Sequence, residues 1–219
     1  RHLITSPSDC APTHSADDSV IWLWDQVSES WCGANDLNPA SITPLSRDSS
    51  QPSDQQCWHL CSRGLACLDP DEGQILDAAT DHGGKVVIVH DPWRPVPAIG
   101  GHLSPSAGPC DRASLDRRSD IAVFTGAPLQ GALHLRGKPK LRLHACADQP
   151  GFDLCVALSR LPLGTNTVQQ LSTGMLRVRG QQALELCERE LDLQPLLATF
   201  EPGDRLRLSI AGAAWPAIA

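Results

Sequence analysis

Three cysteines and a histidine lie close together at Cys57, His59, Cys61 and Cys67. Thiolate and imidazole groups are the ligands that zinc prefers, and structural zinc sites usually show two closely spaced ligand pairs. Here the second pair is missing. Cys57, His59 and Cys61 also alternate along one short run, so a strand would place them on a single face, which is a poor start for a tetrahedron. We therefore predict no metal site and no cofactor.

Serine chemistry would need a nucleophile on a sharp strand-to-helix turn, with a glycine two residues before and two residues after the serine. Ser62 and Ser104 come nearest, and both lack the pair of glycines. The run from Asp81 to Gly84 is similar to the glycine-rich oxyanion segment of some lipases, but a turn before the apolar run at 85–90 explains it as well. We expect the turn and predict no catalytic residue.

Cationic side chains alternate with apolar ones along three runs of the chain. The cationic positions are Arg136, Lys138, Lys140, Arg142, Arg177, Arg179, Arg205 and Arg207. Because the side chains of a strand point alternately to its two faces, these residues could line one sheet face, opposite residues such as Leu135 and Leu141. One interpretation is an interface with another domain or with an acidic ligand. The alternative is a solvated face balanced by Glu185, Glu188, Glu190 and Asp192.

The segments that carry these residues have the composition of short β-strands. Apolar and polar side chains alternate over 133–144, 175–179 and 205–210, whereas 152–158 is almost continuously apolar, as in a strand covered on both faces. The 18 prolines and 17 glycines favour many turns over long helices. The sequence therefore predicts an all-β fold, a jelly-roll β-sandwich with few short helices.

Other runs are shorter and predict single elements. We expect strands at 20–24, 56–60, 85–90 and 120–125, with 65–68 returning as the hairpin partner of 56–60. Residues 181–193 have the composition of a helix, yet their leucines alternate with polar residues, which favours a strand. One helical turn is predicted at 195–200. Pro139 should interrupt strand pairing or mark a sheet edge.

The predicted organisation is an irregular lead-in at 1–19 followed by one domain at 20–219. Within that domain, 35–56 is a polar surface loop, and 91–101, with three prolines and two glycines, is a rigid extended crossing. The chain begins with Arg1 and holds a single methionine, so we expect a fragment of a longer protein whose sheet continues beyond Ala219.

The composition excludes several classes of function. A formal net charge of −7 argues against nucleic-acid binding, which relies on neutralising phosphates with Lys and Arg. No run approaches the ~20 apolar residues of a membrane span, and no signal pattern is visible. The nine cysteines are odd in number in a chain that is not small, which favours reduced thiols and a cytoplasmic location.

Short segments also follow one another in the order of a known family. They are 91–101, 118–125, 127–129, 147–153, 173–177, 202–208 and the pair Trp215-Pro216. In this order they resemble the C-terminal, non-catalytic domain of the cocaine esterase and X-Pro dipeptidyl-peptidase family of α/β-hydrolases. The likeness covers nearly the whole chain and is strongest from Asp91 onward. Tyrosine is absent, although that family uses it freely.

The resemblance implies a galactose-binding-like jelly roll that packs on an α/β-hydrolase domain of the same polypeptide and helps to shape its substrate cleft. The parent protein would be a serine hydrolase, either an X-Pro dipeptidyl-peptidase or an acyl esterase, with its nucleophile upstream of Arg1. This chain alone would be inactive, and His2 would follow the catalytic histidine rather than replace it. A homo-oligomer is a further expected association. The alternative functions are a carbohydrate-binding module and a dimerisation module.

Overall fold

The computed structural model describes residues 22–25, 30–33, 56–80 and 83–218, which fall into two compact units, 1–55 and 56–219. In the first unit, β1 (Trp22–Asp25) and β2 (Ser30–Gly33) form an antiparallel hairpin with Trp24 opposite Trp31. The strand predicted at 20–24 is thus confirmed from Trp22 onward. The predictions for 1–19 and 35–55 lie outside the described residues.

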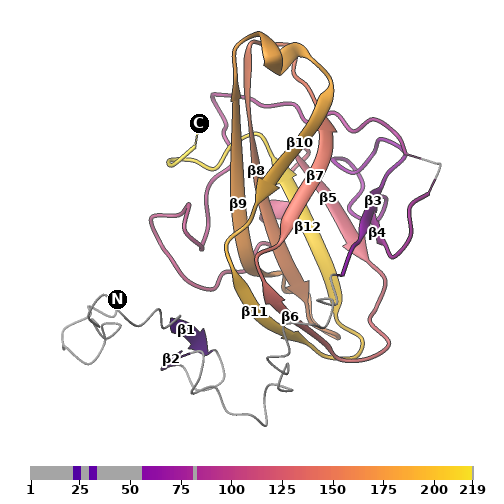
Figure 1. The fold of residues 1–219 in the computed structure, drawn as a ribbon, viewed down its shortest axis with the longest axis vertical. Helices are drawn as coiled ribbons and strands as arrows, with labels where there is room; N and C mark the ends of the chain where they lie inside the picture. Colours follow the sequence, from indigo (N-terminus) through magenta and orange to yellow (C-terminus); the bar gives the residue numbers. More distant parts are fainter. Residues whose placement is uncertain (1–21, 26–29, 34–55, 81–82, 219) are drawn as a thin grey trace, which may run out of the picture. The chain divides into compact units, whose positions relative to one another are not determined.

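The second unit is built on a six-stranded sheet (Figure 1). Its strands, in spatial order, are β3 (His59–Cys61), β4 (Gln74–Leu76), β5 (Ile121–Gly126), β12 (Arg205–Ala211), β8 (Gly151–Leu161) and β9 (Gln169–Arg179). All neighbours pair antiparallel except β4 and β5, which are parallel. Such pairing of strands distant in sequence is expected of a jelly roll.

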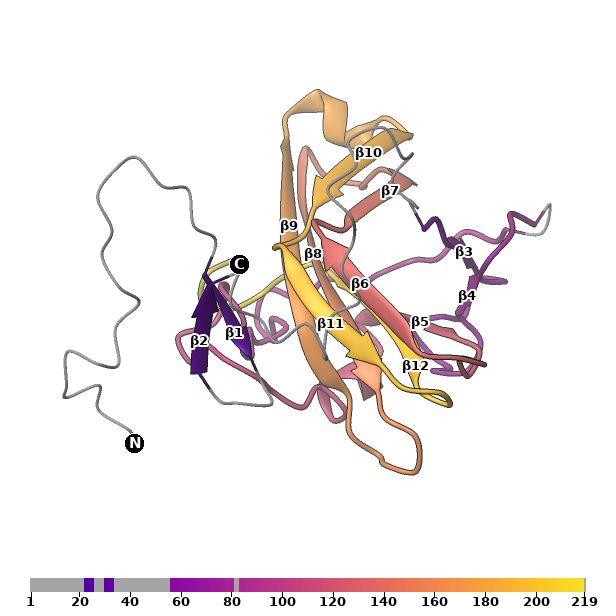
Figure 2. The same ribbon diagram turned by 60° about the horizontal axis from the view of Figure 1, so that its bottom comes forward.

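A two-stranded ribbon lies over this sheet (Figure 2). One side of the ribbon is β6 (Leu133–Gly137) followed by β7 (Lys140–Ala145), and the other is β10 (Cys187–Asp192) followed by β11 (Leu196–Phe200). β7 pairs with β10 and β6 with β11. Pro139 lies between β6 and β7, as predicted, because it has no N–H to donate to the ladder.

The main core fills the space between the ribbon and one face of the sheet. Leu141, Leu191 and Phe200 enter it from the ribbon, and Val156 and Leu208 enter it from the sheet. At one side the layers meet through an isolated bridge between Gly174 and Leu193. A Cβ at Gly174 would lie 2.5 Å from the carbonyl oxygen of Asp192, so only glycine fits this contact without displacing backbone.

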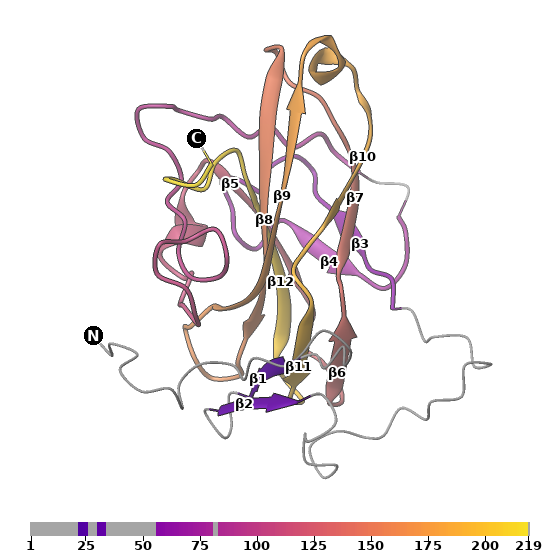
Figure 3. The ribbon, with the colours of Figure 1, turned by 60° about the vertical axis from the view of Figure 1, so that its left-hand side comes forward.

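The opposite face of the sheet is covered by loops (Figure 3). Val96, Leu115 and Ala213, which follows β12, pack there on Ile121 and Val123 of β5. A 3-10 helix, η2 (Leu115–Arg117), lies in this cover, and a second one, η3 (Gln181–Leu184), precedes β10. Within the described segments no helix has the length and apolarity needed to cross a bilayer. The all-β sandwich predicted from the sequence is confirmed.

Three local predictions are wrong, and a fourth is confirmed only in part. Residues 65–68 form a turn, and β3 pairs instead with β4, because the Glu72 carboxylate accepts the N–H groups of Arg63 and Leu65 and closes a loop. Residues 85–90 join no ladder in the described part of the chain. Residues 196–200 are strand β11 rather than a helical turn, since pairing with β6 and burial of Phe200 prevail. Residues 181–193 begin with η3, so the strand there starts only at Cys187.

Candidate interface

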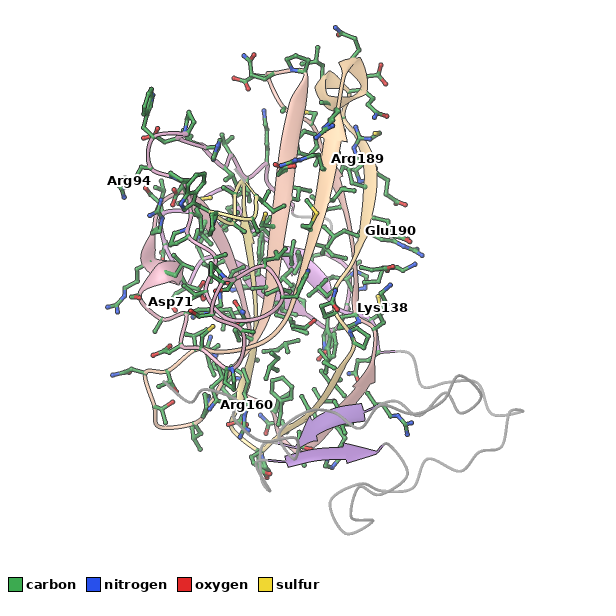
Figure 4. All side chains as sticks on the ribbon, turned by 90° about the vertical axis from the view of Figure 1, so that its left-hand side faces the viewer. Asp71, Arg94, Lys138, Arg160, Arg189 and Glu190 are labelled. Carbon is green, nitrogen blue, oxygen red and sulfur yellow. The ribbon has the colours of Figure 1, made fainter. Side chains whose placement is uncertain are left out.

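The cationic residues of the ribbon are largely neutralised by acidic residues on the neighbouring strand. Lys138 lies 2.8 Å from Asp192, and Glu190 accepts hydrogen bonds from Lys140 at 2.5 Å and Arg142 at 2.7 Å. Figure 4 shows Lys138 and Glu190 on one side of the sandwich. The hydrogen bonds from Lys140 and Arg142 lower the pKa of Glu190. This part of the predicted surface has the geometry of the balanced, solvated face.

Arg136 differs from its neighbours on the ribbon. It is exposed on β6 and lies opposite Leu197 of β11, which is itself partly exposed. No ion pair or side-chain hydrogen bond joins Arg136 to another described residue. Its charge and the apolar surface beside it are therefore available to a partner.

The other predicted cations lie on the opposite face of the six-stranded sheet. On β9, Arg177 donates two hydrogen bonds of 2.7 Å to Asp153, while Arg179 is exposed and joins no ion pair in the described residues. On β12, Arg205 donates to the carbonyl of Gly126 at 2.9 Å. The cationic residues thus divide between two opposite faces, and the structure does not bring them together on one.

Arg207 is held inside a polar network under the covering loops. Its Nε donates to Thr125 Oγ1 at 3.0 Å, and its Nη1 lies 3.7 Å from Asp116 Oδ2. Burial lowers the pKa of Arg207, and the nearby Asp116 carboxylate opposes that shift. Only 11% of the Arg207 side chain is exposed. A residue in this position stabilises the loop cover and cannot serve as an open contact surface.

The partners of Arg207 were not predicted from the sequence. Asp116 is 3% exposed, and its Oδ1 accepts hydrogen bonds from Arg112 Nε at 3.3 Å and from Ser209 Oγ at 2.9 Å. Arg112 in turn donates to Gln170 of β9 at 2.8 Å. The signal for this network is the i, i+4 spacing of Arg112 and Asp116, which is typical of an ion pair on a helical turn. The network attaches η2 to the sheet.

The serines nearest to a nucleophile motif have structural partners. Ser62 is buried, and its Oγ donates to Glu72 at 2.6 Å while accepting from the Gly64 N–H. Ser104 Oγ accepts from the N–H of Ser106. Among the described residues, neither serine has a histidine as a hydrogen-bond partner. Asp81 and His82 lie outside the described residues.

The cysteine and histidine cluster is drawn out along β3 and the turn that follows. Cys57 is exposed, Cys61 accepts a hydrogen bond from Thr80, and Cys67 donates to the carbonyl of Val87. Burial raises the pKa of Cys67, and the nearby Asp120 adds to the effect. Across the segments that the structure describes, no group of three His, Cys, Asp or Glu residues is arranged to hold a metal ion.

Comparison with family models identifies one family. The family model "X-Pro dipeptidyl-peptidase C-terminal non-catalytic domain" matches residues 39–219. Among solved structures, an aminopeptidase from a marine sediment Thaumarchaeota archaeon matches 90% of this chain with a TM-score of 0.60 and 16% identity. An alpha-amino acid ester hydrolase matches 74% of it, also with a TM-score of 0.60, at 18% identity.

The matched part is a minority of each solved chain. This chain spans 33% of the length of the aminopeptidase and 29% of the length of the ester hydrolase. At these identities the structural likeness shows the fold alone. The comparison with curated proteins returned no match.

Proposed function

The chain belongs to the family of X-Pro dipeptidyl-peptidase C-terminal non-catalytic domains, and from this premise we propose that it is the accessory domain of a serine hydrolase. A catalytic α/β-hydrolase domain elsewhere in the same polypeptide would carry the nucleophile. The β-sandwich would pack on that domain and help to shape its substrate cleft. The parent activity would be X-Pro dipeptidyl-peptidase or acyl esterase.

The observation that carries this proposal is the family match over residues 39–219. In addition, the serine nearest to a nucleophile motif already has a structural hydrogen-bond partner. Ser62 is buried against Glu72 rather than aligned with a histidine base. A Ser-His-Asp mechanism needs the nucleophile within hydrogen-bond reach of its base. The consequence to be tested is that the chain supplies a packing surface and has no hydrolytic activity of its own.

The test is a pair of activity measurements. The purified 219-residue chain should release no p-nitrophenol from an ester and no dipeptide from an X-Pro substrate. The polypeptide encoded with its upstream sequence should hydrolyse at least one of them. Turnover by the chain alone would contradict the proposal, as would an upstream sequence that encodes no Gly-x-Ser-x-Gly elbow followed by Asp and His.

We further propose that cationic side chains contribute to the contact between the domains. Among the predicted residues, Arg136 and Arg179 support this best because they are exposed and have no acidic partner among the described residues. Arg205 and Arg207 are poor choices for a test, since their side chains hold Gly126, Thr125 and Asp116.

A charge reversal tests this contact in the intact hydrolase. Arg136→Glu should raise KM or weaken domain association without lowering the melting temperature of the β-sandwich. The matched control is Arg117→Glu, which reverses an exposed arginine outside the predicted set. Equal effects of the two reversals, or none, would remove Arg136 from the interface.

A cytoplasmic location and a homo-oligomer remain proposals. The reducing compartment is supported by the cysteines at 57, 67, 110, 146, 155 and 187, which form no disulfide with one another. Light scattering on the intact polypeptide would test the oligomer, and fractionation of the source cells would test the compartment.

A further inference from the structure

Residues 85–90, here called the apolar segment, alternate in burial like a strand but pair with no strand of the described residues. Val86 and Ile88 pack against the main core, while Val87 and Val89 are exposed, the latter by 67%. The only hydrogen bond to their backbone from a described residue is the one that the Val87 carbonyl accepts from the Cys67 thiol. The N–H groups of the segment therefore have no partner in the described part of the chain.

A rigid turn follows and presents a tryptophan. Asp91 closes the turn twice, since its side chain accepts from the Trp93 N–H at 2.9 Å and its carbonyl accepts from the Arg94 N–H at 3.1 Å. The carbonyl of Arg94 is bound by Arg118 at 2.7 Å, and Arg118 is held by Asp120. Trp93 at the tip is 94% exposed. Ordered backbone thus carries a large apolar side chain into solvent.

Other exposed apolar residues flank the same stretch. Trp215, 52% exposed, lies on the C-terminal segment that bridges to Pro97. Leu68, 71% exposed, follows Cys67, whose thiol contacts Val87. Several large exposed apolar side chains along one stretch make it a candidate binding surface. An unpaired, flat run of β-branched residues is also a template for strand pairing, which natural proteins usually cover or block with charge.

We propose that the apolar segment and Trp93 form the docking surface for the hydrolase domain of the same polypeptide, with a strand or loop of that domain pairing with residues 85–90. This inference rests on the proposed function. It places the main domain contact on the apolar segment, on different residues from the ribbon cations. Figure 4 shows that Arg94, next to Trp93, lies on the side of the sandwich opposite Lys138 and Glu190.

The occupant follows from the length of the relatives. In the matched structures this fold accounts for 33% and 29% of the chain, so most of such a polypeptide lies outside it. A tethered neighbour acts at an effective concentration of about millimolar, which favours it over a second copy in dilute solution. The surface is apolar and its turn is fixed, as expected for a permanent contact with an exposed tryptophan as anchor.

Hydrogen exchange on the intact polypeptide tests the inference. The amides of residues 86–89 should exchange at least 100-fold more slowly in the intact polypeptide than in the 219-residue chain, because only the former supplies a pairing strand. Val89→Lys and Trp93→Ala should each speed that exchange at least tenfold in the intact polypeptide. The matched control is Leu186→Lys, since Leu186 is 68% exposed and lies just before β10, distant in sequence from the segment.

Each other outcome overturns the inference. Fast exchange at 86–89 in a polypeptide that still hydrolyses its substrate would leave the proposed function standing and remove this surface. Equal protection in the 219-residue chain would mean that the chain covers the segment itself. Protection that depends on protein concentration would assign the surface to a second copy, and protection that appears only with added oligosaccharide would assign it to a sugar. An inactive polypeptide with no hydrolase domain would instead refute the proposed function.

Discussion

Burial is the main cause of the raised pKa of the Cys155 thiol. Cys155 lies on β8 in a cluster with Ala214 and Ile218, and desolvation raises its pKa to about 12. Because the thiolate is the reactive form, a thiol with this pKa is almost entirely unreactive at pH 8. Cys57 and Cys146 are exposed on the same molecule and provide an internal comparison.

We expect iodoacetamide at pH 8 to label Cys57 and Cys146 at least 100-fold faster than Cys155 in the native state. The difference should vanish in urea, where unfolding exposes Cys155 and returns its pKa to an ordinary value of about 8.5. Peptide mass spectrometry after timed quenching measures the rates. Labelling of native Cys155 at the rate of Cys146 would show that the cover formed by residues 214–218 opens readily.

At the same scale, Asp116 illustrates why a charged residue can be structural. Two arginines and a serine approach its carboxylate, and its Oδ2 has no hydrogen-bond partner in the described residues. Removing one partner of such a buried pair generally costs more than the pair contributes, because a charge is left uncompensated. A reversal of Arg207 would therefore report on folding before it could report on binding.

At the scale of elements, Gly174 controls how closely β9 approaches the turn between β10 and β11. Gly174→Ala would place a Cβ 2.5 Å from the Asp192 carbonyl oxygen and 3.0 Å from the Leu193 Cα. Since both atoms belong to backbone, a strand must move, and we expect a loss of about 2 kcal/mol in the free energy of unfolding. Urea titration followed by tryptophan fluorescence measures it.

Gly131→Ala is the control for this prediction, because a Cβ at Gly131 would meet nothing within 4 Å. It should be neutral or slightly stabilising through its effect on the unfolded chain. Similar losses from the two substitutions would indicate that helix or strand propensity, and not the contact between the layers, dominates at Gly174.

The elements also show what sequence patterns can and cannot predict. Strands β7, β8 and β12 were predictable, because alternation or a continuous apolar run reports burial directly. The apolar run at 85–90 also predicted a strand, and Val86 and Ile88 do pack on the main core, but the pattern of one segment says nothing about whether another strand lies beside it. The hairpin at 65–68 was wrong because a single side chain, Glu72, redirects the chain through backbone contacts.

At the scale of the whole molecule, the candidate site was only partly predictable. The exposure of the ribbon cations follows from their alternate positions along the strands. Their pairing with Asp192 and Glu190 depends instead on the register of β7 against β10. The division of the predicted cations between two faces depends on which sheet each strand joins. Neither register nor sheet membership is encoded in local alternation, so the family resemblance carried the functional prediction instead.

Loop carboxylates make the stability of the whole sandwich sensitive to acid. Asp204 is buried, which opposes ionisation, but it accepts hydrogen bonds from the N–H groups of Glu201 and Leu163 and from Arg160, and these lower its pKa. Glu72 is likewise buried, and hydrogen bonds from Ser62, Arg63 and Leu65 outweigh that burial and lower its pKa. Both groups are more acidic in the folded chain than in the unfolded one.

A carboxylate with a depressed folded pKa stabilises the protein above its unfolded pKa, about 4, and loses that contribution as pH falls through the folded value. We therefore expect the free energy of unfolding to fall steeply below pH 4. The double variant Glu72→Gln and Asp204→Asn should be less stable at pH 7, with a flatter dependence between pH 5 and pH 3. Urea titrations at these pH values measure both effects.

Glu188→Gln, at an exposed carboxylate, is the control and should keep the steep pH dependence of the parent chain. An unchanged slope in the double variant would mean that acid acts on other groups, and that these two loops do not control the stability of the molecule.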